Sequence, residues 1–153
     1  MQHPFYEFSI LDNAHRFEFE SIGPRKIRKL VYFDKTDIPN FYNLSLGDQL
    51  SNGKVSFITV SNNSDRDRDK VIATTIQILL HFLNIYPDAY VLFSGNTPER
   101  TRLYQIIIVR ELATNQTNLC FWGMDEEGNI QPFEKNKSYI GFIISFNKKL
   151  PNL

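Results

Sequence analysis

The feature that most constrains the fold is a long apolar segment, Val71 to Ile85, which ends before Pro87 and Asp88. Its apolar residues occupy nearly every face of a helix, and such a helix must lie deep in a fold, covered by other elements. The continuous apolar run Ala89 to Phe93 follows, and this pattern is typical of a central buried strand. The chain must therefore build a sheet against which this helix packs.

The first third of the chain supplies strands for that sheet. In Arg16 to Ile22 the phenylalanines alternate with charged residues, which is the pattern of a half-buried strand. Gly23-Pro24 is a turn signal, and Arg25 to Phe33 is rich in strand-favouring residues, so we expect a hairpin. Further strands are predicted over Phe41 to Leu46, Val55 to Val60, Asn118 to Met124 and Ser138 to Phe146.

A second helix is predicted from Pro98 to about Ala113, because Pro98 is suited to the first helical position and Thr97 to the cap. The element order is strands, helix, strand, helix, strands. This order predicts an α+β fold with a largely antiparallel sheet and two main helices packed on one face. The 153 residues show no repeat and no linker, so a single domain over 1–153 is expected.

Charge, cysteine content and hydropathy narrow the class of protein. The 17 basic and 17 acidic residues cancel, so any surface for nucleic acid must be a local patch. Cys120 alone cannot form an internal disulfide, and no Cys/His spacing resembles a zinc site, so no metal or cofactor is expected. The N-terminus does not resemble a signal peptide, and no apolar run reaches the ~20 residues of a membrane span. These features predict a cytoplasmic protein without a membrane partner.

The clearest local signal for a site is the strand–glycine–helix junction from Gly95 to Arg102. Such a junction points free N–H groups and a partial positive charge outward, and Arg100 and Arg102 add fixed charge that suits a phosphate. The alternative is an ordinary helix start, with Arg102 paired to Glu99 and Arg100 placed over Tyr104. The ligand-binding residues predicted here are Gly95, Asn96, Thr97, Arg100 and Arg102.

His81 lies inside the apolar helix, where a core or rim histidine is the ordinary interpretation. If the chain is an enzyme, His81 near Arg100 or Arg102 would suit metal-independent, ribonuclease-like cleavage of a phosphodiester. These three residues are the catalytic candidates.

Two other charged segments have structural interpretations beside functional ones. The basic strand Arg25 to Lys29 could follow a nucleic-acid backbone, but pairing with Glu18 and Glu20 on the preceding strand is favoured. The segment Asn62 to Asp69 loosely resembles a calcium loop, yet it lacks the glycine and closing glutamate of an EF-hand. A solvated loop and helix cap is the preferred interpretation of that segment.

Three segments taken together, Asn43 to Asp48, Ser61 to Thr74 and Ser94 to Tyr104, resemble a family of small bacterial proteins of unknown function. The resemblance extends from Tyr6 to about Phe146. It implies a bacterial cytoplasmic protein and supplies no catalytic residues. Small proteins of this kind often belong to toxin–antitoxin or defence operons, which is an association rather than a mechanism.

Two hypotheses for function follow. The first is a phosphate- or RNA-binding protein, a toxin-like component, that acts at the helix start Gly95 to Arg102. The second is a non-catalytic interaction module that uses an aromatic sheet face or edge to bind a small protein partner or a second copy. It rests on 13 Phe and seven Tyr residues, more aromatic side chains than one small core readily buries.

Overall fold

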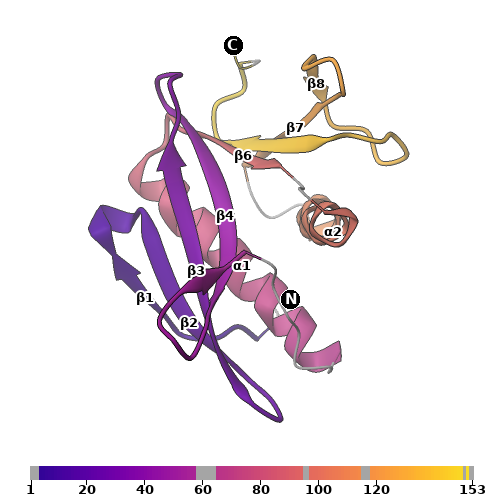
Figure 1. Cartoon of the computed structure of the whole chain (residues 1–153). Helices are drawn as coiled ribbons and strands as arrows, with labels where there is room; N and C mark the ends of the chain where they lie inside the picture. Colours follow the sequence, from indigo (N-terminus) through magenta and orange to yellow (C-terminus); the bar gives the residue numbers. More distant parts are fainter. Residues whose placement is uncertain (1–3, 58–64, 95–96, 115–117, 150, 152–153) are drawn as a thin grey trace. The chain divides into compact units, whose positions relative to one another are not determined.

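The computed structural model describes residues 4–57, 65–94, 97–114, 118–149 and 151. The chain divides into two compact units: unit 1 comprises Met1–Asp34 and Ser45–Ile85, and unit 2 comprises Lys35–Leu44 and Tyr86–Leu153. Each unit is described by itself below, with the elements labelled as in Figure 1. The single domain expected from the sequence stays a prediction.

Unit 1 is built from the N-terminal strands and the first helix. Its strands follow the hydrogen-bonded order β1-β2-β3-β4, with β5 paired to β4. The helix α1 lies along one face of these strands (Figure 1). The elements are β1 (Phe8–Leu11), the short 3-10 helix η1 (Asp12–Ala14), β2 (Arg16–Ile22), β3 (Lys26–Lys35), β4 (Phe41–Gln49), β5 (Val55–Ser56) and α1 (Asp65–Ile85). Strand β4 begins in unit 2 and ends in unit 1.

The alternation predicted for β2 is present in the structure, and its phenylalanines lie in the core of unit 1. Phe17 and Phe19 are buried, whereas Glu18 is only half-buried and Glu20 is exposed. The hairpin with β3 is confirmed, and it pairs Phe17 with Val31 in an antiparallel register. The apolar faces of α1 are buried as well, as the sequence predicts for this helix.

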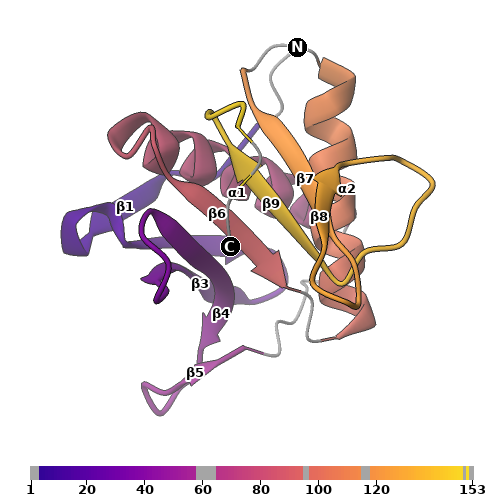
Figure 2. The same ribbon diagram turned by 90° about the horizontal axis from the view of Figure 1, so that it is seen from above.

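Unit 2 is built around strand β9 and the second helix. Its strand order is β4-β6-β9-β7-β8, in which β6 is parallel to the first residues of β4 and the other pairs are antiparallel. Helix α2 packs against β9, on one face of the strands (Figure 2). The elements are β6 (Tyr90–Ser94), α2 (Pro98–Thr114), β7 (Cys120–Met124), β8 (Ile130–Pro132) and β9 (Gly141–Ser145).

The α+β class, the largely antiparallel sheet and the two helices are confirmed. Two strands, β1 and β8, were not predicted from the sequence. Both are short and lie at the ends of the strand order, so each is hydrogen-bonded to a single neighbouring strand. The predicted strand from Val55 is shorter in the structure, where β5 spans Val55–Ser56, and positions 58–60 lie outside the described residues.

Candidate functional site

The predicted helix start is only partly described. Helix α2 begins at Pro98, as predicted, and the Thr97 carbonyl accepts hydrogen bonds from the N–H and the hydroxyl of Thr101 at 3.0 and 3.1 Å. Gly95 and Asn96 lie outside the described residues, as does the side chain of Arg100. The side chain of Arg102 is exposed, and no described residue forms an ion pair with it. In the described part of this helix start, the guanidinium of Arg102 is therefore available to an anionic ligand.

His81 lies in unit 1, whereas Arg100 and Arg102 belong to unit 2. Its ring is half-buried and meets Phe8 and Phe17 edge-on, with ring centroids 6.2 and 6.0 Å apart. These contacts are those of a histidine packed among aromatic side chains.

Two cations of the basic segment, Arg28 and Lys29 on β3, form ion pairs with acidic residues. Arg28 lies 3.8 Å from a Glu18 carboxylate oxygen and 3.6 Å from one of Glu20, so the predicted pairing with the preceding strand is confirmed. Lys29 points to the opposite face, where its ammonium lies 2.8 Å from Asp48 on β4. Both side chains of this second pair are buried, so Lys29 contributes to the interior of unit 1 and not to its surface.

A buried polar cluster anchors the N-terminal segment to α1 and β2. The hydroxyls of Tyr6 and Ser21 donate hydrogen bonds of 2.7 and 2.6 Å to the same carboxylate oxygen of Asp67. The Ile22 N–H donates to the Tyr6 hydroxyl at 3.1 Å, and the Tyr6 N–H donates to the Thr74 hydroxyl at 2.8 Å. This cluster fixes the point at which the N-terminal segment leaves the edge of β2.

The environment of Tyr6 makes the stability of unit 1 sensitive to alkaline pH. Burial raises the pKa of Tyr6 above its ordinary value, and the hydrogen bond to the Asp67 carboxylate raises it further. Since the folded pKa lies above the unfolded value of about 10, the stabilisation is complete below pH ~10 and is lost as the pH rises through the folded pKa.

We therefore expect the Tyr6→Phe variant to lose less stability between neutral and strongly alkaline pH than the parent chain. Urea denaturation at the two pH values measures this difference. Tyr32→Phe serves as the matched control, because it removes a half-buried tyrosine hydroxyl from the opposite face of the hairpin. An equal alkaline loss in the parent chain and Tyr6→Phe would contradict this role of Tyr6.

The backbone of β1 has a free edge, which can be located from the strand register. The Phe33 N–H donates to the His15 carbonyl at 2.8 Å, so the odd-numbered residues of β2 bond toward β3. The even-numbered residues of β2 consequently face β1, and Ser9 and Leu11 lie opposite two of them. It follows that the N–H and C=O groups of Phe8 and Ile10 point away from β2. Among the described residues no strand covers that side.

The side chains around this edge are unusually apolar for a surface. Of the eight large hydrophobic side chains found exposed in the described chain, four lie on β1 or next to it. These are Phe5, Ile10, Leu11 and Ile22, with exposed fractions of 40, 45, 39 and 57%. No residue of β1 carries a charge, although carboxylates follow and precede it at Asp12 and Glu7.

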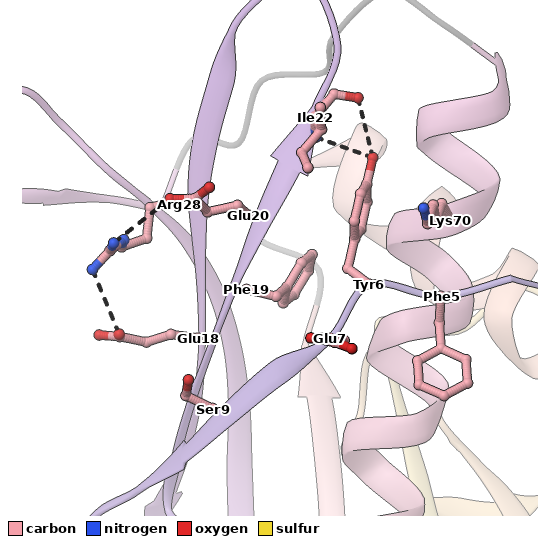
Figure 3. Close-up of a pocket in the computed structure, with 10 residues that line it drawn as sticks. All are labelled: Phe5, Tyr6, Glu7, Ser9, Glu18, Phe19, Glu20, Ile22, Arg28 and Lys70. Carbon is pink, nitrogen blue, oxygen red and sulfur yellow. Dashed lines mark hydrogen bonds and ion pairs between the residues drawn. The ribbon is translucent and has the colours of Figure 1, made fainter.

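An open pocket of about 550 Å³ adjoins the N-terminal end of β1 (Figure 3). Tyr6 and Phe19 stack within it with ring centroids 6.0 Å apart, and the Lys70 ammonium lies 4.4 Å from the Tyr6 ring centroid. Its lining has more carboxylates than cations. The lining residues are Phe5, Tyr6, Glu7, Ser9, Glu18, Phe19, Glu20, Ile22, Arg28 and Lys70.

The sequence predicted an aromatic sheet face or edge only in general terms, and neither β1 nor this pocket was predicted from it. The alternation of Arg16 to Ile22 gave a signal for β2, but the pocket is formed where a segment without periodicity crosses that strand. Within the described part of the chain no group of His, Cys, Asp and Glu side chains is arranged to hold a metal ion. Neither described helix is long and apolar enough to cross a membrane.

Comparison with known proteins gives the family of the chain without an activity. Neither the curated proteins nor the solved structures contain a match. A family model described as "Family of unknown function (DUF6934)" matches residues 2–147. The resemblance found in the sequence segments is thereby confirmed at the level of the family, and the chain belongs to the family of unknown function DUF6934.

Proposed function

We propose that this chain is a non-catalytic interaction protein that binds an extended segment of a partner protein along the free edge of β1. The observation that carries the proposal is the pair of outward-pointing backbone positions, Phe8 and Ile10, on an uncharged terminal strand. An extended peptide can add to such an edge through main-chain hydrogen bonds, while alternate side chains provide specificity.

The side chains of β1 support this proposal because natural sheet edges are normally protected. Charged side chains, prolines and bulges prevent edge strands from pairing with other chains. Strand β1 contains no charged side chain and no proline, and it exposes Ile10 and Leu11 to solvent. An exposed apolar edge of this kind is typical of a surface that a partner covers.

The experiment uses a short fluorescent peptide of alternating threonine and isoleucine with glutamine at both ends. We expect the parent chain to bind it and Ile10→Pro to lose binding by tenfold or more, because proline removes an outward N–H. The fold should tolerate this change, since that N–H faces solvent, whereas Leu11→Pro removes an N–H that faces β2 and should destabilise β1. Equal binding by the parent chain and a folded Ile10→Pro variant would contradict the proposal.

The helix start of α2 remains a second candidate, as a phosphate- or RNA-binding and toxin-like site. The observation that favours it is the exposed Arg102, which has no ion-pair partner among the described residues. Positions 100 and 102 lie on different sides of the helix, so a ligand that uses both must be larger than one phosphate. Arg100→Ala combined with Arg102→Ala should abolish binding of a short RNA with little change in Tm. A large fall in Tm would instead assign these arginines a structural role.

A further inference from the structure

We propose that the segment bound at β1 is basic, with an uncharged, alternately apolar centre and a lysine or arginine near each end. This inference rests on the proposed function and specifies the chemistry of the partner. It follows from the charges at the two ends of β1, from the lining of the neighbouring pocket and from the unsuitability of a second copy of the chain.

The two carboxylates that flank β1 are available to a partner. Glu7 and Asp12 are both exposed, and no described residue forms an ion pair with either of them. Glu18, in contrast, lies 2.7 Å from the Arg16 guanidinium and also contacts Arg28. The unpaired negative charge therefore lies at the ends of the edge, where the ends of an added strand would lie.

The pocket provides a place for one of the two cationic side chains. Glu7 lies in its lining beside Tyr6, and Glu18 and Glu20 line the same hollow (Figure 3). The aliphatic stem of a lysine or arginine can pack against an apolar side chain of the lining, while its charged end reaches a carboxylate. The Lys70 ammonium is placed over the Tyr6 ring, which leaves Glu7 for the partner.

A second copy of this chain supplies no counter-charge at the edge. Because the outward N–H and C=O groups belong to Phe8 and Ile10, two antiparallel β1 strands could pair Phe8 of one copy with Ile10 of the other, which places Glu7 opposite Leu11. The chain has no lysine or arginine from position 4 to position 13, so a second copy would bring no cation to Glu7 or Asp12 and would add two further carboxylates. A basic segment instead brings a cation to each end of the strand.

The test compares three peptides that share the threonine–isoleucine centre and end in lysine, glutamine or glutamate. We expect the lysine peptide to bind the parent chain about fivefold more tightly than the glutamine peptide and the glutamate peptide to bind least. Added salt should reduce the advantage of the lysine peptide. In the double variant Glu7→Gln, Asp12→Asn, the lysine and glutamine peptides should bind alike.

The matched control neutralises two exposed carboxylates of unit 2, Glu126→Gln and Asp88→Asn, and should leave the lysine preference unchanged. Equal binding of all three peptides, still abolished by Ile10→Pro, would overturn the basic partner and leave the proposed function standing. Failure of all three peptides to bind would contradict both. A dimer of the parent chain in light scattering that Ile10→Pro dissociates would replace the basic segment by a second copy.

Discussion

Replacing Lys29 by alanine is expected to lower the free energy of unfolding by about 3–5 kcal/mol. The Lys29 ammonium lies 2.8 Å from the Asp48 carboxylate, with only 4 and 3% of the two side chains exposed. Removing Lys29 takes the ammonium of this pair away from a buried carboxylate, and the cost of that desolvated charge exceeds the value of the pair itself.

Urea denaturation of the variants measures this effect. Lys26→Ala is the matched control, because Lys26 lies on the same strand with its side chain exposed, and it should change stability by less than about 0.5 kcal/mol. The double variant Lys29→Met, Asp48→Leu removes both charges and should be considerably more stable than Lys29→Ala. A loss below about 1 kcal/mol for Lys29→Ala would show that water reaches the pair.

Replacing Phe82 by alanine is expected to lower the free energy of unfolding by about 3–5 kcal/mol as well, for a different reason. The Phe82 side chain is fully buried in unit 1, and its ring stacks on that of Phe33 with centroids 4.0 Å apart and planes 3° apart. Alanine would lose the apolar burial and leave a cavity beside a ring held by the sheet, which cannot easily close it.

The control for this prediction is Phe57→Ala, since Phe57 is 46% exposed and, of the rings in the described part of the chain, contacts that of Tyr32. Its loss should be less than about 1 kcal/mol. Similar losses for Phe82→Ala and Phe57→Ala in urea denaturation would contradict the packing described for unit 1.

The sequence predicted the parts of the fold that local patterns determine. The alternation in Arg16 to Ile22, the apolar helix from Val71 to Ile85 and the proline at position 98 each indicate their element without information from elsewhere. Strand β1 could not be predicted in this way, because Phe8–Leu11 has no alternation of apolar and polar residues. Its conformation depends on pairing with β2.

The candidate site was less predictable because distant residues form it. Tyr6 and Asp67 are 61 positions apart in the chain, yet their hydrogen bond fixes the segment that borders the pocket. The basic composition of Arg25 to Lys29 indicated a charged surface, whereas the pairing of Lys29 with Asp48 depends on β3 and β4 lying side by side. The junction near Pro98 also carried a local signal, and the phosphate site predicted from it lies elsewhere and stays a prediction.

Hydrogen exchange of the backbone amides of β1 tests the docking edge most directly. In the free protein the N–H groups of Phe8 and Ile10 should exchange rapidly, because they point to solvent, while those of Ser9 and Leu11 should be protected by β2. Saturation with the lysine-ended peptide should slow exchange at Phe8 and Ile10 and leave Ser9 and Leu11 nearly unchanged. Unaltered exchange at Phe8 and Ile10 in the bound protein would contradict strand addition at β1.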